Sequence, residues 1–284
     1  MSWHDIGRPT LALAALPALA GLGLAAASLA LPDGAAPLFL AGAGVGVSWL
    51  TMVSLLSRQR VLGRLTEGRE RTREEMKNLL RQAEMRISLG ETLGFDALVP
   101  PLRSWAISPD LGWHLVKTIL ETKPRLVVEL GSGASTILIG KALRRVGAGR
   151  LVSIEHEAAY AVDTWWFVEQ HGLTDLVEVR EAPLEPVEVA GRRFSWYRTD
   201  SIEDLRDIDL LLIDGPPWLV GKGARLPALP QLGHRLAKGV RVILDDTDHP
   251  EMRLAIEAWR AEFPSIRTRD LLCEKGGVEV TFGA

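Results

Sequence analysis

Acidic residues follow four short apolar runs in the C-terminal two thirds of the sequence. Glu129, Glu155 and Asp214 each come directly after such a run, and the pair Asp245-Asp246 follows the fourth. A carboxylate can hold a cation or accept hydrogen bonds from hydroxyl groups. If the runs are parallel strands of one sheet, the acids meet at its carboxyl edge, where ligands bind in such folds. A lone acid at a strand end is usually a cap or a solvated turn residue, but acids after four strands predict a ligand site.

The segment around Glu129 has the pattern of a buried strand, a glycine-rich turn and the start of a helix. Gly131 and Gly133 allow a sharp turn and a close approach of the backbone to a ligand. Ser135 or Thr136 can cap the helix that follows. A phosphate-binding loop would not favour a carboxylate at Glu129, whereas a ligand that carries an amine and a sulfonium would.

This acid-x-Gly-x-Gly loop resembles the first motif of class I S-adenosylmethionine (AdoMet) methyltransferases, and the resemblance covers roughly Leu102 to Phe282. It implies that the loop wraps the methionine part of AdoMet, that Glu155 accepts both ribose hydroxyls, and that Glu181 or Ala182 contacts the adenine. The cofactor-binding residues implied by the resemblance are Glu129, Gly131, Ser132, Gly133, Ser135, Thr136, Glu155, Glu181, Ala182, Asp214 and Ser108.

Two other interpretations of the loop remain open. A dinucleotide-binding fold uses G-x-G-x-x-G, but here the third glycine position is Thr136 and a pyrophosphate would face Glu129. Glu155 does not discriminate, because dinucleotide enzymes also bind ribose with an acid at this position. The other alternative is a structural loop without a ligand.

The acids that follow the fourth and fifth predicted strands resemble the metal ligands of catechol O-methyltransferase-like enzymes. That resemblance implies that Asp214, Asp245 and Asp246 bind Mg²⁺, which prefers carboxylate oxygens. The metal would lower the pKa of an acceptor hydroxyl and align it with the methyl group. The alternative is that Asp214 contacts only AdoMet or substrate, while Asp245 and Asp246 cap the next helix.

The sequence departs from the catechol enzymes at the general base, because no lysine follows Asp214 closely. His249 and Lys222 are the nearest candidates, so the predicted catalytic residues are His249, Lys222 and Asp214. A lone loop histidine is more often merely exposed. Lys222 and Arg225 could instead belong to a mobile lid or meet an anionic substrate.

Composition limits the classes of protein to consider. The chain has 284 residues and a formal net charge of −3, which argues against a dedicated nucleic-acid binder. Its one cysteine, Cys273, excludes an internal disulfide framework and fits a reducing compartment.

Two stretches without charged residues, Thr10–Leu31 and Pro37–Leu56, are each long enough to cross a bilayer as a helix. With the short turn between them they predict a transmembrane hairpin over residues 1–57. Arginines flank both ends, so the positive-inside rule predicts an inner or plasma membrane protein with a cytoplasmic catalytic domain. A signal peptide, or two buried helices of a soluble bundle, are the alternatives.

Residues 58–94 are strongly charged and predict a helical stalk or linker, with a broken near-heptad stripe that would allow a coiled-coil homodimer. From residue 95 to 284 strands and helices alternate. This pattern predicts an α/β methyltransferase domain with a Rossmann-like, seven-stranded, mostly parallel sheet and helices on both faces. An inserted hairpin is expected around Gly191.

The sequence therefore predicts a membrane-anchored AdoMet-dependent methyltransferase that acts on a hydroxyl of a glycan, a lipid-linked molecule or another small molecule. No nucleic-acid partner is expected. A nucleotide- or NAD-dependent enzyme on the same sheet and a non-catalytic scaffold that keeps the fold are the alternatives.

Overall fold

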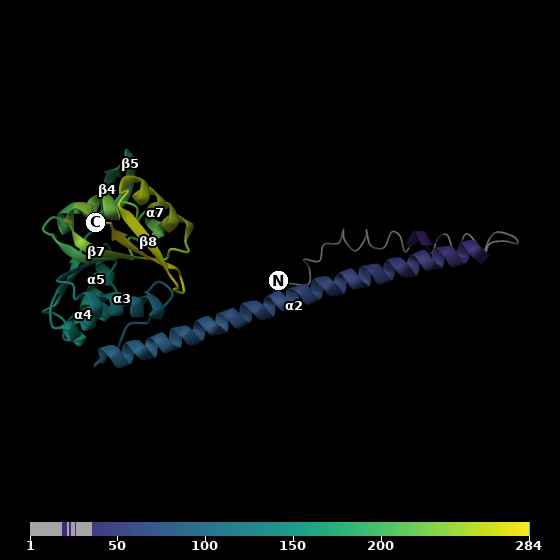
Figure 1. The fold of residues 1–284 in the computed structure, drawn as a ribbon, viewed down its shortest axis with the longest axis horizontal. Helices are drawn as coiled ribbons and strands as arrows, with labels where there is room; N and C mark the ends of the chain where they lie inside the picture. The colour runs from purple at the N-terminus through teal and green to yellow at the C-terminus, as the bar shows by residue number, and fades with distance from the viewer. Residues whose placement is uncertain (1–18, 22, 24–25, 27–35, 284) are drawn as a thin grey trace. The chain divides into compact units, whose positions relative to one another are not determined.

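The computed structural model describes residues 19–21, 23, 26 and 36–283 (Figure 1). The chain divides into two compact units, residues 1–76 and 77–284. The helix α2, Ala36–Leu93, is continuous over 58 residues. Its last part, from Lys77, belongs to the second unit, although the sequence assigned residues 77–94 to a linker.

The predicted membrane location is corrected by this structure. Among the residues described, no helix combines the length and the apolar character needed to cross a membrane. The first predicted span, Thr10–Leu31, lies outside the described residues except for 19–21, 23 and 26. In the second, glycine, serine and threonine interrupt the apolar residues, and it runs without a break into the charged part of α2.

The second unit contains the predicted seven-stranded sheet, in the order β3-β2-β1-β6-β7-β9-β8. The first five of these strands are parallel, and β9 is antiparallel to both of its neighbours. The strands are β1 (Leu126–Leu130), β2 (Arg150–Glu155), β3 (Val177–Glu181), β6 (Ile208–Ile213), β7 (Leu236–Asp245), β8 (Ile266–Leu271) and β9 (Gly277–Phe282). The strand order reverses beside β1, which pairs with β2 on one edge and with β6 on the other. This is the switch point at which ligands bind in such sheets.

Helices cover both faces of the sheet, as predicted, because alternate residues of the strands point to opposite sides. Val128 and Leu130 of β1 belong to one apolar core and Val127 to the other. In Figure 1, α7 lies on one side of the sheet and α3, α4 and α5 on the other. The helices are α3 (Pro109–Thr122), α4 (Ala134–Val146), α5 (Ala158–Gln170), α6 (Ala228–Leu232) and α7 (Pro250–Glu262), with 3-10 turns at Thr199–Ile202, Trp218–Val220 and Gly233–Arg235.

Of two local predictions, the inserted hairpin is confirmed and the length of the helix before β7 is wrong. The expected hairpin forms: β4 (Leu184–Val189) and β5 (Arg192–Tyr197) make a separate two-stranded sheet. The helix expected over 226–237 is short, because Pro230 has no N–H to donate and Gly233 follows it, so β7 already begins at Leu236.

Candidate active site

The glycine turn after β1 packs tightly against the turn after β6. Gly131 has a φ of +95°, in the left-handed region, and a Cβ there would lie 3.2 Å from the backbone nitrogen of Gly215. The turn is tied to the neighbouring strands, since Gly131 N donates to Ile154 O at 2.9 Å and Asp214 N donates to Leu130 O at 3.0 Å. At the start of α4, Gly133 N donates to the Thr136 hydroxyl at 3.0 Å. The loop backbone therefore lies at the switch point, where a larger side chain would not fit.

Glu129 lies under this turn and is fully buried. Its Oε2 accepts hydrogen bonds from the hydroxyls of Thr136 and Ser153, both at 2.6 Å. Its Oε1 has no hydrogen-bond partner among the described residues. Burial raises the pKa of Glu129 to about 7, although the hydroxyls of Ser135, Ser153 and Thr136 act against the increase. One oxygen of this carboxylate is thus left for a group that the chain itself does not supply.

Glu155, at the end of β2, is held in one orientation. Its Oε2 accepts from the Ser132 backbone N–H at 2.9 Å, and its Oε1 accepts from the N–H groups of His156 at 2.8 Å and Glu157 at 2.9 Å. Burial alone would raise the pKa of Glu155, but the His156 side chain and the backbone N–H groups outweigh it, and the pKa is lowered. The carboxylate is therefore ionised at neutral pH and can accept hydrogen bonds from hydroxyl groups.

The remaining predicted cofactor contacts are placed unevenly. Ala182 is buried, and its N–H donates to Glu155 O at 2.6 Å, so the chain after β3 passes beside the ribose-side acid. Glu181 is exposed. Ser108 is buried at the N-terminus of α3 and its hydroxyl has no partner among the described residues.

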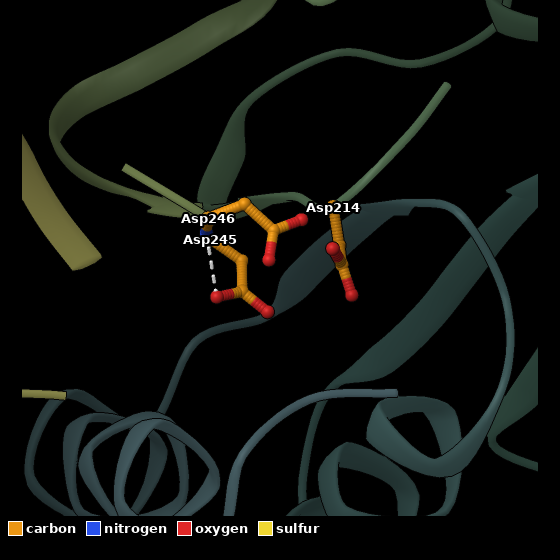
Figure 2. Close-up of side chains that lie close together, drawn as sticks. All are labelled: Asp214, Asp245 and Asp246. Atoms are coloured by element: carbon orange, nitrogen blue, oxygen red, sulfur yellow. Dashed lines mark hydrogen bonds between the residues drawn. The ribbon is translucent and has the colours of Figure 1, made fainter. Parts of the chain in front are cut away.

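Asp214, Asp245 and Asp246 converge as the sequence predicted, with one ligand atom from each lying within 4.8 Å of the others (Figure 2). Asp245 is fully buried at the end of β7, and Asp246 follows it with a φ of +60°. Asp214 comes from the adjacent turn after β6. The convergence arises because β6 and β7 are parallel neighbours whose carboxyl ends meet.

Two basic side chains, neither of them predicted to lie here, already pair with these acids. Arg225 is 2% exposed, and its Nη2 lies 2.9 Å from Asp246 Oδ2 and 3.3 Å from Asp214 Oδ1. Lys275 Nζ lies 3.1 Å from Asp245 Oδ2 and 2.9 Å from Asp246 Oδ1. Burial on its own would raise the pKa of Asp246, but the two cations outweigh it and lower that pKa. Burial raises the pKa of Asp214, where the charge of Asp245 adds to the effect.

The cations also bear on the predicted metal. Each oxygen of Asp245 and Asp246 lies beside a donor or a cation. Asp245 Oδ1 accepts from the Asp246 N–H at 2.7 Å, and Asp245 Oδ2, which accepts no hydrogen bond from the described residues, lies 3.1 Å from the Lys275 ammonium. A divalent ion would have to displace an ammonium group that is already within ion-pair distance of two carboxylates. In this arrangement the cluster does not fit a resident Mg²⁺.

Among the described residues, the side chain of neither predicted base candidate bonds to the acid cluster, although the backbone N–H of His249 donates to Asp246 O at 2.9 Å. Lys222 is exposed in the segment between Trp218–Val220 and α6. His249 caps α7, accepting from the Glu251 N–H at 3.4 Å, and its ring stacks on Trp218 with centroids 4.9 Å apart. Arg225 is buried within the cluster, so it is not part of an exposed lid.

Aromatic rings gather beside the cluster. Trp218 stacks on Trp105 as well as on His249, with the tryptophan centroids 6.3 Å apart and the rings 22° from parallel. Trp105 is 68% exposed and Trp218 is 39% exposed, so the stack offers a flat apolar surface to solvent. These residues come from three loops: the one before α3, the one after β6 and the one after β7.

Tyr197, at the end of β5, lies in the hairpin that the sequence predicted, but it was not among the predicted site residues. It is buried, and its hydroxyl has no partner among the described residues. A Cβ on Gly215 would lie 2.2 Å from this hydroxyl, so the hydroxyl is directly beside the turn after Asp214. Burial raises the pKa of Tyr197, and the nearby charge of Glu155 adds to the increase.

Comparison with known proteins places this site in a methyltransferase domain. A family profile described as a methyltransferase domain matches residues 128–247, from β1 to just past the aspartate pair. No curated protein sequence matches the chain.

Solved structures share the fold. The methyltransferase domain of METTL16 is 15% identical, with a TM-score of 0.50 over 71% of this chain and 94% of its own. An O-methyltransferase of Bacillus cereus in complex with S-adenosylhomocysteine (SAH) is 18% identical, with a TM-score of 0.48 over 71% and 90%. The O-methyltransferase TomG of Streptomyces achromogenes, in complex with AdoMet, is 18% identical, with a TM-score of 0.48 over 64% and 84%. The family match and the shared fold show that the chain carries a methyltransferase domain over residues 128–247.

Proposed function

We propose that this methyltransferase transfers the methyl group of AdoMet to a hydroxyl oxygen of a small acceptor that carries a planar ring. AdoMet supplies a methyl group on a positively charged sulfur, so the leaving group is already activated. The chain then has to bind the two reactants, align them and exclude water.

The cofactor half of the proposal is supported by the pair of acids at the ends of β1 and β2. The free Oε1 of Glu129 is suited to the ammonium of the methionine part, and the oriented Glu155 is suited to the ribose hydroxyls. The loop of Gly131, Ser132 and Gly133, with Ser135 and Thr136, would enclose the methionine part. Ala182 and Glu181 would border the adenine, and Ser108 would lie on the cofactor side of α3.

The acceptor half is supported by the aromatic stack. Trp105, Trp218 and His249 form a flat surface. Trp218 and His249 come from the loops that follow Asp214 and Asp246, and Trp105 comes from the loop before α3. A planar ring can stack on such a surface while its hydroxyl reaches toward the acids. The observation that carries the proposal is this neighbourhood, in which a cofactor site and an aromatic surface meet at one strand edge.

Three roles in this proposal concern the reacting hydroxyl. Asp214 belongs to the acid cluster, and its turn packs against the loop of Gly131, so it is the first candidate to orient the acceptor. His249 is placed to take the proton, since its ring belongs to the aromatic stack. Lys222, which is exposed, would contribute only after the segment that carries it moves.

The test is calorimetric titration of the full chain with SAH. We expect micromolar binding that is lost in Glu155→Ala and kept in Glu262→Ala, a matched change of an exposed glutamate at the end of α7. A screen for methyl transfer from AdoMet then compares phenols with sugars, and we expect turnover on phenols that Trp218→Ala lowers.

Absence of SAH binding by well-folded wild-type protein would contradict the cofactor assignment. Turnover on sugars but not on phenols would contradict the planar acceptor while leaving the cofactor site intact.

A further inference from the structure

Lys275 lies where a bound metal would be expected. It belongs to the loop between β8 and β9, and its side chain is 20% exposed. Its ammonium bridges Asp245 and Asp246, at 3.1 Å and 2.9 Å. A positive charge shared by two converging carboxylates is the arrangement that a divalent cation would otherwise provide.

Arg225 is a second cation held by the same acid cluster. Besides the ion pairs that it makes with Asp214 and Asp246, Arg225 donates from Nη1 to Asp245 O at 3.0 Å and from Nη2 to Asp214 O at 2.6 Å. The guanidinium is thus held by backbone as well as by side chains. The two cations lie between the three carboxylates, so a divalent ion would have to displace one of these fixed side chains to reach the carboxylate oxygens.

The loop of Lys275 is fixed on both sides of the residue. Lys275 O accepts from the Asp248 N–H at 3.1 Å, and Gly276, with a φ of +72°, packs so closely that a Cβ there would lie 2.7 Å from Asp248 N. On the other side, Glu274 accepts from Arg103 Nε at 2.8 Å and from Asn78 Nδ2 at 3.2 Å. The turn that carries Lys275 is therefore held by hydrogen bonds on both sides of the residue, which fixes the position of its backbone.

We propose that the ammonium of Lys275, assisted by Arg225, is the resident cation of the acid cluster and stands in place of a divalent metal. The inference rests on the proposed function, because it assigns the cation that faces the acceptor hydroxyl. It makes methyl transfer by this protein independent of Mg²⁺ and insensitive to chelators. The acids then serve to position two basic side chains rather than to ligate a metal.

The test is titration of the metal-free full chain with Mn²⁺, followed by the electron paramagnetic resonance signal of the free ion. We expect the wild type to take up no stoichiometric Mn²⁺. Lys275→Met vacates the position between the carboxylates, so this variant is expected to bind one Mn²⁺ at least about tenfold more tightly than the wild type. Lys238→Met, a change of an exposed lysine on β7, is the matched control and should behave as the wild type.

Stoichiometric Mn²⁺ binding by the wild type that is lost in Asp246→Asn would overturn the proposal, and this measurement does not depend on the folding of any Lys275 variant. A Lys275→Met protein that is folded, by its circular dichroism, and still takes up no Mn²⁺ would also overturn it. The titration needs no cofactor. Failure of SAH to bind would therefore refute the proposed function without deciding the question of the metal.

Discussion

Glu129 shows how a single buried residue can be prepared for a ligand. Two hydroxyls hold one of its oxygens and leave the other without a partner. A buried carboxylate in this position is destabilised as an anion, which is why its pKa rises to about 7. An ammonium group next to the free oxygen would stabilise the ionised form and offset part of the free energy that burial of the anion costs.

The first prediction follows from this pKa. At pH 6 most Glu129 carries a proton, and at pH 8 most is ionised, so the fraction able to pair with an ammonium rises about tenfold between them. We expect the dissociation constant of SAH to fall about tenfold from pH 6 to pH 8. Calorimetry over this range measures it.

Glu129→Gln provides the control for the pH series, because a glutamine keeps the shape and does not titrate. The variant should bind SAH weakly and with little dependence on pH. If the wild type bound equally well at pH 6 and pH 8, or if the variant kept the full pH dependence, Glu129 would not be the ammonium partner.

At the scale of elements, the hairpin β4–β5 has a task beyond covering the sheet. It forms a sheet of its own. Its last residue is Tyr197, whose hydroxyl lies against the turn that contains Gly215. A buried hydroxyl without a partner costs free energy in the unliganded protein. We therefore expect this hydroxyl to find its partner in the bound cofactor.

The second prediction separates binding from folding. Tyr197→Phe removes a buried hydroxyl that has no protein partner, so the free energy of unfolding should stay the same or rise by as much as about 1 kcal/mol. Its affinity for SAH should fall about fivefold, the equivalent of one hydrogen bond. Chemical denaturation and calorimetry measure the two quantities.

Tyr160→Phe is the matched control for this hairpin prediction, because Tyr160 is 60% exposed on α5. It should change neither quantity. A Tyr197→Phe protein that lost stability and kept its affinity for SAH would show that the hydroxyl serves the fold instead.

Strand-end acids could be predicted from the sequence because the signal is local. Each apolar run ends in its acid, and the parallel arrangement of strands then brings Glu129, Glu155 and Asp214 to one edge. Lys275 could not be found this way. It lies 29 positions after Asp246 in the chain (275 − 246), in a hairpin turn whose direction depends on the antiparallel pairing of β8 with β9. The pattern of residues next to Lys275 in the sequence does not show how these two strands pair.

The membrane prediction was wrong because it rested on two stretches without charged residues. Absence of charge does not make a segment apolar enough to cross a membrane, since small residues such as alanine and glycine each bury little apolar surface. Among the described residues, no helix is long and apolar enough.

For the whole molecule, the boundary between the two compact units falls within α2, after Met76. The part of α2 beyond it is built into the second unit. Leu89 is fully buried and Leu93 is 7% exposed, both in the core beneath α3 and α4. Gln82 donates to Asp110 at 2.7 Å inside the same unit. The sequence predicted that the catalytic domain starts at residue 95, whereas the second unit starts at residue 77. The two boundaries predict different stabilities for fragments that begin at these residues.

The third prediction compares two fragments, 77–284 and 95–284. The longer one should keep the melting temperature of the second unit and its affinity for SAH. The shorter one loses the burial of Leu89 and Leu93, about 1.5–3 kcal/mol each, and leaves the buried Asp110 without Gln82. A loss near 5 kcal/mol is comparable with the whole stability of many domains, so we expect the shorter fragment to be largely unfolded at 37 °C. Thermal unfolding of the two fragments measures whether the shorter one is less stable. Equal melting temperatures would mean that residues 77–94 are a linker after all, and that the catalytic domain folds without the end of α2.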